Sequence, residues 1–229
     1  MPRDSRFVSL ELPAGDVAEQ ERFYSEVLGL EVEAGPSSVG VAAGATRLTF
    51  VSAAAESPVA HFAFNVPADG LSRAIAALDA DVRWLPDNAG HTRHAFPSWK
   101  AEAVYFVDPA GHIVELIARQ DAGLDDGRGM GRVRILGVSE LGIVVPNVIE
   151  AARDLARLSG LAPYGRGGEQ FAAIGDARGL LIVVEEGRPW FPEGETPGEP
   201  VRGRAVFEAP LAAEYVCPAR RLTLEFERE

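Results

Sequence analysis

Hydrophobic and polar residues alternate in several short stretches of the chain, and such alternation predicts half-buried strands. Residues 7–12 and 61–66 show the pattern clearly. In the second stretch three large apolar residues fall on one face, while His61, Ala63 and Asn65 fall on the other. Between such stretches, apolar residues recur at helical spacing, so helices are expected at about 16–28, 70–78 and 151–158.

The predicted elements repeat in the order β-α-β-β-β. One module covers about residues 6–55 and a second covers about 59–119. Strands in these modules are expected near residues 39–41, 47–51, 82–85, 103–107 and 113–117. Because one such module cannot bury its sheet face alone, we expect pairing between modules. The sequence therefore predicts an α+β protein of repeated βαβββ modules, whose paired curved mixed sheets form a cleft.

The domain organisation follows from these repeats. Residues 1–120 are expected to hold the first two modules as a pair, and the Gly- and Asp-rich stretch 121–133 is expected to be a linker. Residues 134–229 are expected to hold a third, weaker module, with strands at 138–145, 171–174 and 180–184, plus C-terminal tail strands. Two tail strands, in RAVFEA and RRLTLEFERE, are expected to cover an exposed sheet edge.

The segment Ala103–Arg119, AVYFVDPAGHIVELIAR, predicts two strands joined by a tight turn. Glu115 is unusual there, because a carboxylate inside an apolar strand needs solvent, a partner or a metal ion. DPAGHIVEL resembles the end of a module in the vicinal oxygen chelate superfamily, which includes glyoxalase I, extradiol dioxygenases and bleomycin-resistance proteins. FYSEVLGLEVE is similar to the helix and second strand of the same kind of module.

This resemblance implies two metal-ligand positions per module, one early on the first strand and one on the last. The second module matches at both, with His61 and Glu115. The first module matches at neither, and Phe7 stands where the histidine would be. In the third module Glu140 matches the first position and Val183 falls at the second. Glu140 can join the other two only if module three packs against module two, or if a second subunit supplies it.

One imidazole and two carboxylates suit Fe(II), Mn(II), Zn(II) or Ni(II). The resemblance thus implies a metal-dependent lyase, isomerase or dioxygenase that acts on a small oxygenated substrate, with Glu140 as third ligand or as general base. The alternative is a non-catalytic binder that sequesters an antibiotic-type small molecule. The missing ligands of module one favour the binder, whereas the retained pair of His61 and Glu115 favours the enzyme. An interaction module is a third hypothesis.

Other residues have weaker signals. Trp99, Tyr105 and Trp190 are expected to line a pocket for a flat substrate, although aromatic residues near strand ends are common in cores. His94 lies in a predicted loop that could close over the cleft and supply an acid or base. His112 is expected to shape the turn before Glu115. Glu140 also has an ordinary interpretation, an ion pair with one of the many arginines.

The amino-acid composition limits the kinds of partner that the protein is expected to bind. With 22 basic and 34 acidic residues the net charge is −12, which argues against nucleic acid. Cys217 is the single cysteine, so the sequence contains neither a disulfide framework nor a cysteine-based zinc cluster. Neither a signal peptide nor a membrane span is evident, which predicts a cytoplasmic protein without membrane association. An exposed sheet edge would permit a homodimer.

Overall fold

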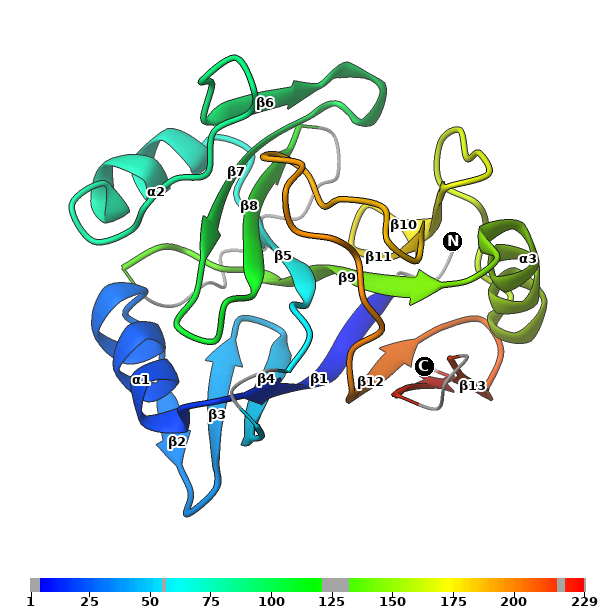
Figure 1. Cartoon of the computed structure of the whole chain (residues 1–229), viewed down its shortest axis with the longest axis horizontal. Helices are drawn as coiled ribbons and strands as arrows, with labels where there is room; N and C mark the ends of the chain where they lie inside the picture. Colours follow the sequence, from blue (N-terminus) through cyan, green and yellow to red (C-terminus); the bar gives the residue numbers. More distant parts are fainter. Residues whose placement is uncertain (1–4, 55–56, 121–131, 218–220, 229) are drawn as a thin grey trace.

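The computed structural model describes residues 5–54, 57–120, 132–217 and 221–228. In these residues the chain forms two curved, mixed, seven-stranded sheets with α-helices at their margins (Figure 1). The predicted α+β class with repeated βαβββ modules is confirmed. The linker expected at 121–133 falls almost wholly outside the described residues.

The first module begins at a well-defined helix start. The Asp16 side chain accepts hydrogen bonds from the backbone N–H groups of Ala18 and Glu19, at 2.9 and 3.1 Å, which satisfies two donors that a helix leaves free. The helix becomes π-helical in its second half and ends before Gly29. Its elements are β1 (Arg6–Ala14), α1 (Val17–Arg22), a π-helical turn (Phe23–Val27), β2 (Val32–Ala34), β3 (Ser38–Ala43) and β4 (Thr46–Ser52).

The second module differs from the prediction at one strand. Residues 82–85 contribute only an isolated bridge between Trp84 and Phe106, and the strand at this sheet edge is Arg93–Phe96 instead. Pro86 follows the bridge and has no N–H to continue a ladder, so the early strand prediction was wrong. The elements are β5 (His61–Val66), α2 (Leu71–Leu78), β6 (Arg93–Phe96), a 3₁₀ turn (Pro97–Trp99), β7 (Ala101–Val107) and β8 (Ile113–Arg119).

The third module has a capped helix between its strands. The Asn147 side chain accepts a 3.0 Å hydrogen bond from the Glu150 backbone, and Gly160 ends the helix with a φ of 74°. The remaining elements are β9 (Gly137–Val145), α3 (Val148–Ser159), β10 (Phe171–Asp176), β11 (Gly179–Glu185), β12 (Gly203–Glu208), β13 (Ala213–Val216) and β14 (Leu222–Glu227). The short strand β13 was not predicted.

Strand pairing places the first two modules in different sheets. The first sheet has the order β13-β14-β12-β1-β4-β3-β2, and the second has the order β10-β11-β9-β5-β8-β7-β6. Each sheet therefore joins an N-terminal module to a later part of the chain, through the antiparallel pairs β1–β12 and β5–β9. β12 covers the edge of β1, as expected for a tail strand, and β14 adds to β12. The pairing of modules two and three brings β9 beside β5.

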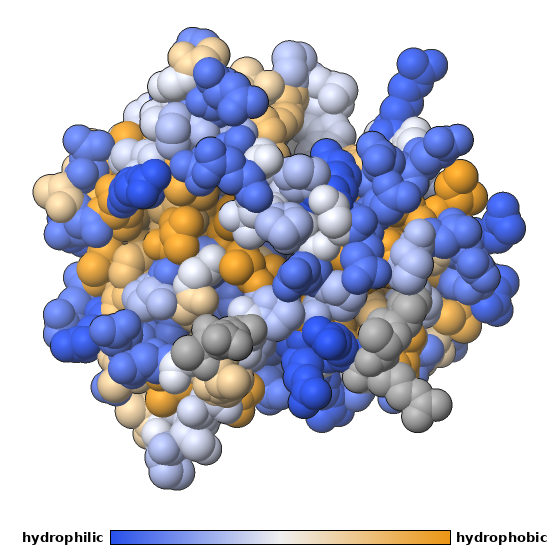
Figure 2. Space-filling view, in the orientation of Figure 1, coloured by the Kyte–Doolittle hydropathy of each residue, from blue (hydrophilic) through white to orange (hydrophobic). Residues whose placement is uncertain are grey.

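The two sheets share one large apolar core. Phe62, Phe64 and Val66 belong to it, while Ala63, on the other face of β5, belongs to a smaller cluster. The predicted alternation of β5 is therefore correct. Figure 2 shows a largely hydrophilic face, with apolar surface gathered between the regions of α1 and α2. None of the helices in the described residues is long and apolar enough to cross a membrane.

The turn before β8 ties the first module to the second. The buried Asp108 carboxylate accepts hydrogen bonds from the side chains of Gln20 and Tyr24, at 2.8 and 3.1 Å. The buried His112 ring accepts from the Ala60 N–H at Nδ1, and its Nε2 lies 2.8 Å from the Pro13 carbonyl oxygen, to which it donates in that tautomer. The His112 ring thus connects the turn to the residue before β5 and to β1, and its expected role in shaping the turn stays a prediction.

Candidate metal centre

The concave face of the second sheet holds a cavity of about 290 Å³. Its floor comes from strands β5, β8, β9 and β11, and aromatic side chains form much of its wall. It is lined by His61, Phe96, Ser98, Trp99, Tyr105, Glu115, Ile117, Glu140, Phe171, Ile182, Arg188, Trp190 and Phe191. A concave, mostly apolar site with a few convergent polar groups is the usual form of a small-molecule site.

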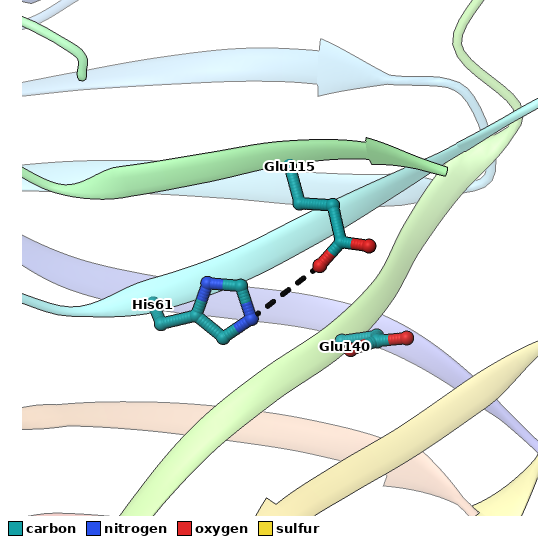
Figure 3. Close-up of side chains that lie close together, drawn as sticks. All are labelled: His61, Glu115 and Glu140. Atoms are coloured by element: carbon teal, nitrogen blue, oxygen red, sulfur yellow. Dashed lines mark ion pairs between the residues drawn. The ribbon is translucent and has the colours of Figure 1, made fainter. Parts of the chain in front are cut away.

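Strand register brings three potential ligands together on this floor. Ala63 on β5 lies opposite Glu115 of β8 on one side and opposite Glu140 of β9 on the other. His61 precedes Ala63 by two residues, so it shares the same face. One ligand atom from each of His61, Glu115 and Glu140 lies within 4.8 Å of the others, and all three residues are buried (Figure 3).

His61 presents an unprotonated nitrogen to this group. Its Nδ1 lies 3.2 Å from the Ile113 carbonyl oxygen, and this contact assigns the proton to Nδ1. Burial lowers the pKa of His61 to about 4, so the ring is neutral at neutral pH. Its Nε2 lies 3.6 Å from the Glu115 carboxylate. The neutral ring therefore makes no charged ion pair with Glu115, and the separation is longer than a hydrogen bond.

Few neighbouring groups offset the cost of burying the two carboxylates. Burial and the nearby charge of Glu140 raise the pKa of Glu115 well above its usual value, although the charge of Arg119 and a hydrogen bond from Tyr105 oppose this. Burial also raises the pKa of Glu140, against the opposing effect of Arg119. The Arg119 Nη2 donates to Glu140 at 2.5 Å. One guanidinium thus serves two buried carboxylates, and a further cation at this point would relieve their desolvation.

These residues fit a divalent transition metal ion. Metal–nitrogen and metal–oxygen bonds in protein sites are about 2.0–2.2 Å, so ligand atoms within 4.8 Å of one another are close to the span of one coordination sphere. The donor set of one imidazole and two carboxylates is typical of such sites. His61, Glu115 and Glu140 could therefore hold a metal ion, and its identity is left open by this donor set.

A tryptophan side chain packs against one of the three candidate ligands. The ring of Trp190 lies 5.1 Å from the ring of His61, centroid to centroid. Gly142 of β9 makes this possible, because a Cβ atom there would lie 2.5 Å from the Trp190 ring. The indole Nε1–H of Trp190 is buried and has no acceptor among the described residues. Because Trp190 also lines the cavity, this donor is a candidate partner for a ligand there.

The resemblance implies a further ligand position on the last strand of module three, which the sequence alignment placed at Val183. The residue that faces the cavity there is Ile182, one position earlier, and it is also apolar. Glu140 pairs with Leu180, and the residue two positions further along β11 is Ile182, which lines the cavity. Val183 packs into the large core on the opposite face. A shift of one residue along a strand exchanges the two faces, which is why the placement of Val183 was wrong.

Besides Trp190, two of the other predicted site residues line the cavity and one does not. Trp99 and Tyr105 line the cavity. His94 lies on strand β6, whereas a loop was expected, and is buried behind Tyr105 with ring centroids 5.7 Å apart. It is not part of the cavity lining. Sequence reasoning missed Arg119, although its spacing of four residues from Glu115 on one strand places both side chains on one face.

Comparison with known proteins gives the fold. No protein-family model and no curated protein matches the sequence. The crystal structure of a putative dioxygenase from Bacillus subtilis subsp. subtilis str. 168 matches with a TM-score of 0.67 and 14% identity, covering 100% of this chain and 87% of that one. Glyoxalase I from Zea mays matches with a TM-score of 0.56 and 12% identity, covering 98% and 92%. The chain has the vicinal oxygen chelate fold.

The resemblance seen in DPAGHIVEL is thus confirmed at the level of fold. Both matches extend over nearly the whole chain, so the vicinal oxygen chelate fold includes the third module and the C-terminal strands as well as residues 6–119. Identities of 12–14% concern the fold alone. The chemistry of this chain has to be argued from the residues of its own cavity.

Proposed function

We propose that this protein is a metal-dependent enzyme that acts on a small oxygenated substrate in the cavity of the second sheet. One observation carries the proposal: three buried ligand atoms, from His61, Glu115 and Glu140, lie within 4.8 Å of one another on the cavity floor. A core that needed only stability would gain little from two buried carboxylates that share one arginine. A bound cation would account for the cluster, because it would offset the cost of burying the two carboxylates.

The metal, when bound, would act as a Lewis acid that polarises substrate oxygens and stabilises an oxyanion or enolate-like species. The protein's own residues prepare the cavity for this. The Ile113 carbonyl fixes the His61 tautomer, and Arg119 orients the Glu140 carboxylate. Trp190 covers His61 and offers its indole N–H to a substrate oxygen.

The walls of the cavity favour a flat or partly apolar substrate. Trp99, Phe96, Phe171 and Phe191 supply aromatic surface, and Ile182 keeps the fourth ligand position free of a competing side-chain donor. We assign Glu140 a ligand role, because its side chain is held by Arg119 at the same point as the other two ligands.

The deciding experiment is elemental analysis of purified tag-free protein, followed by reconstitution with Fe(II), Mn(II), Zn(II) and Ni(II). We expect close to one transition metal ion per chain, and loss of at least nine-tenths of it in Glu115→Gln and His61→Gln. Glu102→Gln is the matched control, since Glu102 is a strand glutamate that pairs with Arg93 away from the cavity. It should retain the metal.

Other outcomes would change the assignment. Absence of metal in the wild type after all four reconstitutions would overturn the proposal and favour the non-catalytic small-molecule binder. Metal retained in Glu140→Gln would remove Glu140 from the ligand set and leave its alternative role as general base. Thermal shift assays with the same metals provide an independent readout of binding.

A further inference from the structure

A second cavity adjoins the metal centre. It also has a volume of about 290 Å³ and shares Ser98 and Trp99 with the first cavity. We call it the Arg119 compartment; it is lined by Ser98, Trp99, Lys100, Arg119, Tyr164, Gly165 and Ala177. Among the described residues, this lining holds two cationic side chains and no acidic one, in a protein whose net charge is −12.

Arg119 has donors that the described residues do not use. The residue is 3% exposed, and its Nη2 donates to Glu140. Its Nε and Nη1 atoms are buried and have no hydrogen-bond partner among the described residues. Buried guanidinium donors almost always have acceptors in folded proteins, so unused donors on a residue that lines a cavity point to an acceptor supplied by a ligand there.

The neighbouring residues hold this arginine in place. The guanidinium carbon lies 5.8 Å from the centre of the Trp99 ring, so the cation is packed against an aromatic surface. Trp99 in turn approaches Gly165 closely, because a Cβ atom at Gly165 would lie 3.0 Å from the indole nitrogen. The side chain is thus fixed between Glu140 on one side and the compartment on the other.

The second cation is placed by an uncommon backbone conformation. Lys100 has a φ of 47° and a ψ of 45°, the single non-glycine residue with positive φ in the part of the chain that the structure describes. This left-handed residue ends the 3₁₀ turn Pro97–Trp99 and leads directly into β7. Such conformations cluster at binding sites, where the surrounding structure maintains them.

We propose that the Arg119 compartment binds an anionic oxygen group, a carboxylate or phosphoryl group, through Arg119 and Lys100. This deepens the proposed function and rests on it in one respect, since the anionic group would belong to the substrate whose other oxygens face the metal centre. The shared wall of Ser98 and Trp99 places the two binding regions next to each other. Arg119 contacts both, through Glu140 and through the compartment.

The test uses benzoate and phenylphosphonate as anionic probes and benzamide as the neutral probe of the same shape. Each is titrated calorimetrically into the full-length protein in the presence of a chelator, so that the probes cannot bind a metal. We expect at least one anionic probe to bind ten-fold or more tightly than benzamide. The proposal is overturned if both anions bind no better than benzamide.

Variants locate the site. Arg119→Lys keeps a positive partner for Glu140 but lacks the guanidinium donors, and it should weaken anion binding at least ten-fold. Lys100→Asn suits the left-handed conformation and should weaken it about three-fold or more, with benzamide unaffected. Arg93→Gln, an exposed arginine on β6 outside both cavities, is the control. Loss of binding in Arg188→Gln, with Arg119→Lys and Lys100→Asn unaffected, would place the anion in the first cavity and overturn the proposal.

The metal content of the same preparations tests the proposed function independently of anion binding. Discrimination between benzoate and benzamide in a protein that holds no metal would support the Arg119 compartment while removing the proposed reaction. Stoichiometric metal in a protein that does not discriminate between the probes would do the reverse.

Discussion

At the scale of single residues, Ala63 illustrates how a side chain without chemistry can set up a site. It lies between Glu115 and Glu140 in strand register, on the face that the cavity occupies. Neighbouring strands are about 4.7–4.9 Å apart, so the two glutamates start about twice that distance from each other. They can converge because the residue between them has only a methyl group.

Enlarging Ala63 should therefore weaken metal binding. Ala63→Val places two extra methyl groups where the carboxylates approach, and we expect at least a ten-fold loss of affinity, measured by competition against a fluorescent metal chelator. Ala173→Val is the matched control, because Ala173 is also buried in the smaller cluster but lies on β10. Both changes should cost about 1–3 kcal/mol of stability through overpacking. Equal metal affinities in the two variants would contradict this role.

The pH dependence of the metal-free protein should reflect Glu115. A carboxyl whose pKa is raised on folding holds its proton more tightly when folded, so its contribution to stability is present below the unfolded pKa of 4.5 and is lost as the pH rises. Removing this group in Glu115→Gln should make the metal-free protein more stable than the wild type at high pH. The difference should grow by up to about 1.4 kcal/mol per pH unit.

Urea unfolding between about pH 5 and pH 8, with chelator present, measures this difference. His61 acts in the opposite direction in both proteins, because its lowered pKa removes stability as the pH falls from 6.5 towards 4. That effect largely cancels in the comparison. A constant difference across the pH range would mean that Glu115 is not buried as a proton-binding carboxyl.

Sequence reasoning reached part of this site for a physical reason. Glu115 could be predicted because it interrupts an apolar strand after a turn that resembles a known module, and His61 because that resemblance implies a ligand early on the module's first strand. Ile182 was missed by one position, since strand bounds uncertain by one residue exchange the two faces. The unused donors of Arg119 depend on its surroundings and cannot be read from a strand pattern.

At the scale of elements, the sequence pattern predicted where the strands lie but not which strands pair. Alternation found β1, β5, β8 and β9, because each strand has one face in the shared core and encodes that burial locally. Which strand lies beside β5 is a long-range question. β9 pairs with β5 across the intervening chain, and the resulting position of Glu140 beside Glu115 follows from tertiary structure alone.

The contact between β9 and the segment after β11 can be tested at Gly142. Gly142→Ala adds a Cβ that would lie 2.5 Å from the Trp190 ring, so Trp190 must move away from His61. We expect a red-shifted tryptophan emission as the indole becomes more exposed. Gly168→Ala is the control, because nothing lies within 4 Å of a Cβ at that position. An unchanged emission spectrum in Gly142→Ala would show that Trp190 does not pack on β9.

At the scale of the whole molecule, the two sheets form one core and should unfold together. Phe207 on β12 is fully buried and packs against Phe7 of β1, with ring centroids 4.7 Å apart, and both belong to the cluster that also includes Phe62 of the second sheet. Phe207→Ala should lower the free energy of unfolding by about 3–5 kcal/mol. Because the core is shared, that loss should also appear at the second sheet.

Tryptophan fluorescence can report this, since all three tryptophans, at positions 84, 99 and 190, lie outside the first sheet. The urea midpoint from fluorescence should fall together with the midpoint from far-ultraviolet circular dichroism. Val206→Ala, on the less buried face of β12, is the control and should shift both far less. Separate midpoints in Phe207→Ala would mean that the two sheets are independent folding units.

The β5–β9 pairing has a consequence for how the candidate metal centre responds to protein concentration. His61 and Glu115 come from the second module and Glu140 from the third, and a single polypeptide connects the two modules. Glu140 is therefore present near the other two ligands at a fixed and high effective concentration. Assembly of the site is therefore a unimolecular event. At constant free metal, dilution of the protein by several orders of magnitude should leave the occupied fraction of sites unchanged.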